Sequence, residues 1–170
     1  FMDDTDQIVT SPEDDASFQE IAHRMQASIT AWQGGIRATG GAIVPEKSHW
    51  YLIDFVWTHG HWRYATEAET PAQISVQDST GTEKMLERLA PDEARRTLGV
   101  RLAPDGNCDD QFKFMVNVAT DWGEHIRTGH LPRHLVWESM HTTILRTLLY
   151  PLPATTLSQK QCHQIMAPIL

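Results

Sequence analysis

The pattern of hydrophobic and polar positions predicts one long helix near the start of the chain. Apolar residues recur at helical spacing over residues 18–36, and Trp32 falls on the same face, where we expect core packing. Residues 11–14 bring an early proline and acidic side chains, which are typical of a helix start. The helix should end at one of two glycine pairs, residues 34–35 or residues 40–41.

Short strands are predicted on both sides of this helix. Before it, residues 1–2 and 7–10 would pair across a tight acidic turn. After it, aromatic and β-branched residues predict a β-rich stretch, with strands at residues 49–57, 61–64, 74–76 and 97–102. The turn-like residues 58–60 make the first two of these a hairpin. Residues 103–107 form a turn that closes the last strand.

After residue 107 the pattern becomes helical. Apolar stripes predict helices at residues 112–126, 135–148 and 156–166, with two prolines interrupting the pattern at residues 151 and 153. Trp122 lies on the first of these stripes, and we expect it in the core. The expected fold class is α+β, with a mixed part over residues 1–107 and a helical part over residues 108–170.

Composition and charge narrow the possible functions. Hydrophobic residues make up 41% and charged residues 21% of the 170 residues, as in globular proteins. No apolar run approaches the ~20 residues needed to span a bilayer, and the acidic start lacks the positive region of a signal peptide. Two distant cysteines indicate a reducing compartment, so we expect an intracellular protein. The net charge of −8 counts against independent nucleic-acid binding.

Asp3 and Asp4 are the sharpest chemical feature. Adjacent carboxylates on a turn between strands suit Mg²⁺, which prefers oxygen ligands. Two such ions about 4 Å apart stabilise the attacking and leaving oxygens of phosphoryl transfer. A solvated acidic turn is the commoner explanation for an isolated pair of this kind, because aspartate is a frequent turn residue.

The order of the segments resembles a reverse transcriptase of a non-long-terminal-repeat retrotransposon. Residues 1–6 resemble the aromatic-x-Asp-Asp signature of the palm, motif C, and an amphipathic helix follows. Residues 40–48 resemble motif D with its lysine, and residues 97–100 resemble the Leu-Gly strand of motif E. The helical end, including residues 149–153, is similar to the thumb. The resemblance therefore implies a partial palm of antiparallel strands and one main helix over residues 1–107, then a thumb over residues 108–170.

The resemblance also implies roles for individual residues. Asp3 would ligate catalytic Mg²⁺ (or Mn²⁺), and Asp4 would lie nearby as a less direct ligand. Lys47 would serve the phosphates of the incoming deoxynucleoside triphosphate, which suits an ammonium point charge. Leu98 and Gly99 would belong to the strand that grips the primer end. The implied partners are an RNA template and a DNA primer, with no membrane.

The chain departs from the family pattern in two ways. Residues 48–96 are longer than the usual connection between motifs D and E. The third metal ligand of the family lies on an upstream strand that this sequence does not include, and the fingers are absent as well. The apolar ends of the sequence likewise suggest a piece of a longer chain. We therefore expect a fragment that is inactive alone.

Two other functions stay open. A decayed or repurposed retroelement remnant would act as a non-catalytic binding or structural module. An unrelated acidic metal-binding domain would instead bind metal tightly by itself. His59 and His61, with His49 nearby, could converge on zinc, but their turn positions favour surface histidines because zinc needs at least three convergent donors.

Overall fold

The computed structural model describes residues 5–11 and 16–170, and the chain divides into two compact units, Phe1–Glu93 and Ala94–Leu170. Both units combine helices with short strands, so the fold is α+β as predicted. The second unit is not purely helical, because the hairpin of strands β7 (Arg95–Thr97) and β8 (Val100–Leu102) packs against its first helix. The boundary between the two units therefore lies before this hairpin in the chain, whereas the sequence pattern changes from mixed to helical near residue 107.

The first unit contains the long helix α1 (Phe18–Ala38). The Ser17 hydroxyl caps it by accepting a hydrogen bond from the Glu20 backbone N–H. The helix therefore begins later than residues 11–14, where the sequence predicted its start. It ends beside Gly40, whose φ of 81° suits glycine because a side chain is disfavoured there. This confirms the second of the two predicted glycine pairs.

The described segment before α1, residues 5–11, contains no strand. Residues 7–10 form no strand, and Ile8 is 89% exposed, so the predicted strand at this position is wrong. The hydroxyl of Ser28 on α1 donates a hydrogen bond to Oε1 of Gln7 at 3.1 Å. The other half of the predicted pair, residues 1–2, lies outside the described residues.

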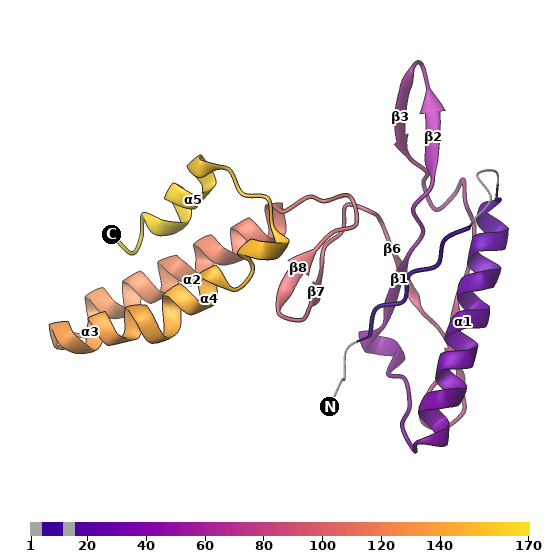
Figure 1. The fold of residues 1–170 in the computed structure, drawn as a ribbon, viewed down its shortest axis with the longest axis horizontal. Coiled ribbons are helices and arrows are strands. Elements are labelled where there is room, and N and C mark those ends of the chain that lie inside the picture. The colour runs from indigo at the N-terminus through magenta and orange to yellow at the C-terminus, as the bar shows by residue number, and fades with distance from the viewer. Residues whose placement is uncertain (1–4, 12–15) are drawn as a thin grey trace. The chain divides into compact units, whose positions relative to one another are not determined.

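The strands of the first unit are three or four residues long. They are β1 (His49–Tyr51), β2 (Phe55–Thr58), β3 (His61–Tyr64), β4 (Ser75–Gln77), β5 (Glu83–Met85) and β6 (Glu87–Leu89). Within the described part of the unit they form the two-stranded pairs β1–β6, β2–β3 and β4–β5. Figure 1 labels the first two of these pairs. The hairpin of β2 and β3 confirms the predicted hairpin, but the predicted strand at residues 49–57 is divided into β1 and β2, which belong to different pairs. The expectation that all strands of this part are antiparallel is wrong. Strands β1 and β6 pair in parallel, and a long connection joins them.

The core of the first unit lies between α1 and the strands. Trp50, Leu52 and Ile74 are buried there, and apolar side chains of α1 pack against them. Trp32 was predicted to join this core, but it is 43% exposed. The next residue, Gln33, takes the inward position instead, and one residue corresponds to a rotation of about 100° around the helix.

Two glutamines of α1 bind the backbone of β4. Gln26 donates to the Ser75 carbonyl at 3.0 Å and accepts from the Ser75 N–H at 2.9 Å. Gln33 makes the same pair of bonds with Gln77, at 2.9 and 3.2 Å. The backbone groups of the residue between Ser75 and Gln77 face away from the helix, toward β5. The two amides therefore complete the edge of β4 that lies toward the helix.

The buried amide of Gln33 should contribute measurably to stability. Replacing Gln33 with alanine leaves the N–H and C=O of Gln77 without these partners, and we expect a loss of about 1–3 kcal/mol in the free energy of unfolding. The matched control is Gln19→Ala on the same helix, where the side chain is exposed and the change should stay within about 0.5 kcal/mol. Urea denaturation followed by circular dichroism measures the free energy of unfolding of both variants. Equal losses in the two variants would contradict the role assigned to the Gln33 amide.

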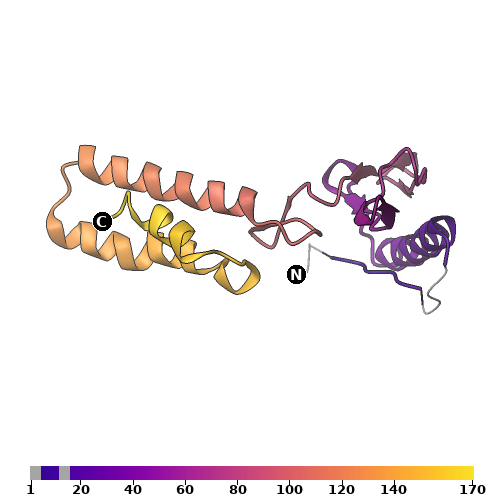
Figure 2. The same cartoon turned by 90° about the horizontal axis from the view of Figure 1, so that it is seen from above.

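The second unit packs its helices around α2 (Asp109–Thr128). Its other helical segments are α3 (Arg133–Ser139), a π-helical turn (Met140–Ile144), α4 (Leu145–Leu149), a 3₁₀ turn (Leu152–Ala154) and α5 (Gln159–Met166). The segments from α3 to α4 form one continuous helical run that lies alongside α2 in both views (Figure 1, Figure 2). These elements confirm the three helices that the apolar stripes predicted.

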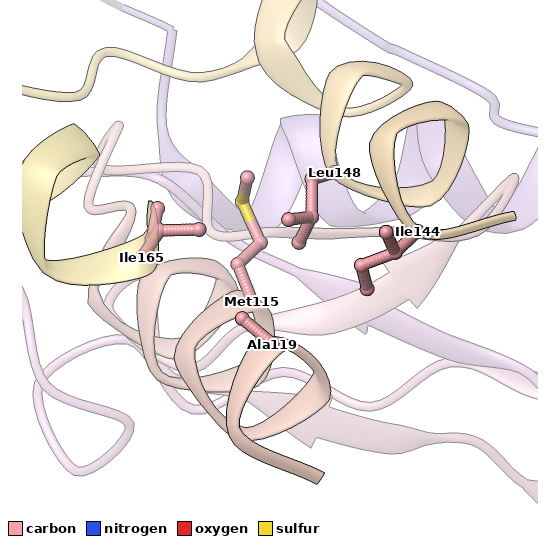
Figure 3. Close-up of a cluster of buried hydrophobic side chains, with 5 residues drawn as sticks. All are labelled: Met115, Ala119, Ile144, Leu148 and Ile165. Atoms are coloured by element: carbon pink, nitrogen blue, oxygen red, sulfur yellow. The ribbon is translucent and has the colours of Figure 1, made fainter. Parts of the chain in front are cut away.

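Figure 3 shows the core of this second unit. The side chains that meet there are Met115, Ala119, Ile144, Leu148 and Ile165, which come from α2, the run from α3 to α4, and α5. Trp122 packs against this cluster, and its ring N–H donates to the Ser139 hydroxyl at 3.0 Å. The prediction for Trp122 is therefore confirmed. None of the helices in the described part of the chain is long and apolar enough to cross a membrane.

Candidate functional site

The predicted metal ligands Asp3 and Asp4 lie outside the described residues. Thr5 and Asp6, which follow them, are exposed. Within residues 5–11 and 16–170, no group of three or more His, Cys, Asp or Glu side chains comes together in a way that could hold a metal ion. The roles of Asp3 and Asp4 therefore stay predictions.

Lys47 is the last residue of a 3₁₀ turn, Pro45–Lys47, that leads into β1. Proline at the first position suits such a turn, since its missing N–H would have no partner there. The turn is closed by Ser48, whose hydroxyl donates to the Val44 carbonyl at 2.9 Å. Lys47 itself is exposed. Its ammonium group is therefore accessible to a phosphate, and within the described part of the first unit no contact distinguishes it from a surface lysine.

Leu98 and Gly99 form the tip of the β7–β8 hairpin in the second unit. The sequence predicted one continuous strand over residues 97–102, and this is wrong because the chain reverses at these two residues. Both have a left-handed backbone, with φ of 49° at Leu98 and 87° at Gly99, as the tightest hairpin turns require. Leucine is uncommon in this conformation, so Leu98 is a strained position.

Tyr150 holds this tip from the end of α4. Its hydroxyl donates a hydrogen bond to the Leu98 carbonyl at 2.8 Å. A Cβ atom added to Gly99 would lie 3.4 Å from Cε1 of the Tyr150 ring, so the ring also packs close to the glycine. The Leu98 and Tyr150 side chains remain exposed. The tip is thus a supported, exposed turn that presents apolar surface beside backbone groups.

A second contact fixes the hairpin to α2. Gln111 is only 1% exposed, and its Oε1 accepts a hydrogen bond from the Arg101 backbone N–H at 2.8 Å. The Arg101 guanidinium lies 4.2 Å from the centre of the Phe114 ring, within the range of a cation–π interaction. Strand β8 is therefore anchored to the first turns of the helix that follows it.

Sequence reasoning missed both supports of the hairpin. Tyr150 lies 52 residues from Leu98 along the chain, and no local pattern links the two. Gln111 follows two aspartates at the start of a helix, a context that favours a solvated residue. Its burial depends on the return of β8 over α2, which the prediction of a single strand at residues 97–102 did not include.

Removal of the Tyr150 hydroxyl tests the support of the tip. Tyr150→Phe should lower the free energy of unfolding by about 0.5–1 kcal/mol and speed hydrogen exchange of the tip amides, because one hydrogen bond is lost. Tyr64→Phe is the control, because Tyr64 contacts its neighbours through its ring, which the substitution keeps. Unchanged exchange at Gly99 in Tyr150→Phe would contradict the assignment.

The β2–β3 hairpin, here called the aromatic ribbon (residues 55–64), is the second candidate site. Its register pairs Phe55 with Tyr64 and Trp57 with Trp62. Directly paired residues point to the same face of a ribbon, so all four rings share one face. Phe55, Trp62 and Tyr64 contact one another with ring centres 5.3–5.5 Å apart. The ribbon extends away from α1 within the first unit (Figure 1).

A network of hydrogen bonds fixes the base of the ribbon. Two nitrogens of the Arg63 guanidinium donate to the two carboxylate oxygens of Glu69, at 2.7 and 2.5 Å. The Thr66 backbone N–H and hydroxyl also donate to Glu69. The Arg63 hydrogen bonds, followed by those from Thr66, lower the pKa of Glu69 to about 2. At the same end of the ribbon, the Ala65 N–H donates a hydrogen bond to the Asp54 carbonyl at 2.8 Å.

The lowered pKa of Glu69 gives a stability effect with a defined sign. The ionised carboxylate is favoured in the folded state, so its stabilisation is complete above the ordinary value of 4.5 and is lost as the pH falls from there through about 2. Carbon-13 NMR titration of Glu69 should give a midpoint near 2, and Arg63→Gln should raise it by at least about one unit. Arg146→Gln, also exposed, should not change it. A wild-type midpoint near 4.5 would refute the network.

The predicted site residues belong to different units. Lys47 lies in the first unit, whereas Leu98 and Gly99 lie in the second, and each is placed only within its own unit. No family model matches the sequence, and neither a curated protein nor a solved structure matches it. The assignment of function therefore depends on the residues themselves.

Proposed function

We propose that the chain is the C-terminal palm and thumb portion of a reverse transcriptase from a non-long-terminal-repeat retrotransposon. The parent enzyme would add deoxynucleotides to a primer 3′ hydroxyl by two-metal catalysis, copying an RNA template. Asp3 and Asp4 would supply part of the Mg²⁺ or Mn²⁺ site. Lys47 would serve the triphosphate, and Leu98 and Gly99 would contact the primer end.

The order of the motifs carries this proposal. Four segments that resemble motif C, motif D, motif E and the thumb follow one another in the family order, with an amphipathic helix after the first. Each segment is a weak signal by itself, because a pair of aspartates or a Leu-Gly dipeptide is common. Four such segments in one order over the whole chain are much harder to obtain by accident.

Features of the two units are compatible with these roles. Lys47 is exposed on a short turn at the start of a strand, where an ammonium group can reach a phosphate. The Leu98–Gly99 tip exposes a backbone turn that Tyr150 and Gln111 hold in place through their own contacts. A supported turn can contact a sugar or phosphate group with little loss of conformational freedom.

The distribution of charge adds a further argument. The first unit contains sixteen Asp and Glu residues against six Lys and Arg residues, so all of the acidic excess lies there. The second unit contains eight Lys and Arg residues against six Asp and Glu residues, and it also holds five of the nine histidines. The net charge of −8 therefore does not describe the thumb-like unit, which is slightly basic, as contact with a phosphate backbone requires.

Primer extension tests the proposal. The chain should be joined to the segment that its gene encodes upstream, because the family places its third metal ligand there. With Mg²⁺, deoxynucleoside triphosphates and a primed RNA template, we expect extension that Asp3→Asn abolishes. Lys47→Ala should slow nucleotide addition by about 10²-fold if the lysine acts as a general acid. Lys84→Ala, another exposed lysine of the first unit, should have little effect.

The alternative of a non-catalytic remnant predicts a different result. The extended chain would then fold and show no nucleotide addition with either Mg²⁺ or Mn²⁺. A stop codon immediately before the codon for Phe1 would also favour the remnant, since no upstream strand could then complete the metal site. Tight Mg²⁺ binding by the 170-residue chain alone would instead favour an unrelated metal-binding domain.

A further inference from the structure

The aromatic ribbon exposes more ring surface than its own stability explains. Phe55, Trp57 and Trp62 are 54%, 72% and 55% exposed. An isolated two-stranded hairpin is only marginally stable, so contacts among Phe55, Trp62 and Tyr64 are needed to hold the strands together. Trp57 is different, because within the described residues its ring makes no contact with another ring. Its large apolar face is therefore exposed.

The size of this face limits what can cover it. An aromatic side chain buries about 150–250 Å² when fully covered, so the exposed parts of Phe55, Trp57 and Trp62 offer roughly 400 Å². A protein partner would bury a similar area, giving about 800 Å² in total, below the roughly 1,000 Å² of a stable protein interface. A few nucleotides need far less surface, because each base covers about one ring.

The chemistry of the ribbon favours flat, unpaired bases. Its ring face holds four aromatic side chains, and the ten residues of the ribbon include none of the sixteen acidic residues of the first unit. The ribbon therefore carries no carboxylate that would repel a phosphate. Its one arginine, Arg63, is paired with Glu69, so electrostatic attraction is weak and stacking has to supply most of the affinity.

We propose that the ring face of the aromatic ribbon binds single-stranded nucleic acid by stacking unpaired bases on Trp57 and Trp62. The turn at His59–Gly60, with φ of 52° and 81°, keeps the two strands in close register, and the Glu69 network fixes the base. The rings are therefore held in position before a ligand arrives. Stacking on such rings tolerates every base, because each base has a π face.

This proposal extends the polymerase assignment but does not require it. In a reverse transcriptase, the ribbon would hold unpaired template outside the catalytic centre. The ribbon itself belongs to a segment that the family pattern does not include. Binding by stacking needs neither a metal ion nor Asp3. The ribbon can therefore be tested in EDTA with the chain itself, and its success or failure is separate from that of primer extension.

The test measures the fluorescence anisotropy of labelled twelve-residue oligomers of uridine and of thymidine, with a blunt duplex as control. We expect both single strands to bind at least tenfold more tightly than the duplex, whose bases are stacked on one another. Trp57→Ala should weaken single-strand binding about tenfold, in line with one lost stacking contact. The slope of log affinity against log salt should stay shallow, about −0.7 for each phosphate contact.

Matched variants make the result decisive. Trp137→Ala removes a tryptophan of the second unit that is 63% exposed, and it should leave binding within about twofold of the wild type. Trp57→Phe keeps a ring and should retain most of the affinity. Circular dichroism confirms that each variant folds, which is expected at Trp57 because its ring lies in solvent.

Several outcomes would overturn the proposal. They are absence of single-strand binding at 50 mM salt, equal weakening by Trp57→Ala and Trp137→Ala, and binding that requires RNA, which would indicate recognition of the 2′ hydroxyl rather than stacking. Self-association that Trp57→Ala abolishes, without oligomer binding, would show that the ribbon is a protein-docking face instead.

Discussion

Short strands are the constraint on which the rest of this structure depends. Each described strand has only three or four residues, so the strands cannot satisfy their own backbone groups as a wide sheet would. Helix-borne glutamines supply the missing partners. Gln26 and Gln33 bond both backbone groups of Ser75 and Gln77, and Gln111 accepts from the backbone of Arg101. Both units use the same solution, in which a buried amide fixes a strand to a helix.

This arrangement has a consequence for function. Hairpins anchored by a helix or by an ion pair at the base can leave their ends exposed without losing their shape. The β7–β8 hairpin is fixed by Gln111 and Tyr150 and presents Leu98 and Gly99. The aromatic ribbon is fixed by the Arg63–Glu69 pair and presents its rings. In both hairpins, residues with a positive φ form the tip, where the chain reverses most tightly.

The division of charge between the units bears on what each could bind. A single net charge for the chain hides an acidic first unit and a slightly basic second unit. Metal-dependent phosphoryl transfer needs carboxylates in one place and phosphate-binding groups in another, so a polymerase portion would divide its charge in this way. Stacking on the aromatic ribbon would add a third kind of contact that depends little on charge.

The sequence by itself determined the helices and the β2–β3 hairpin, because periodicity and turn chemistry are local properties of the chain. For the end of α1 it left two glycine pairs open, and the structure selected the second. The order of the four motifs, and with it the proposed function, is also a property of the sequence alone. Only the tertiary structure decided that Gln33 rather than Trp32 is buried, that β1 pairs with β6 in parallel, and that Tyr150 holds Leu98. These features depend on contacts between residues far apart in the chain, and side chains that look solvent-facing in a local pattern can be buried by such contacts. The buried polar side chain of Gln111 bonds a backbone group outside its own helix, and no spacing rule within that helix carries this information.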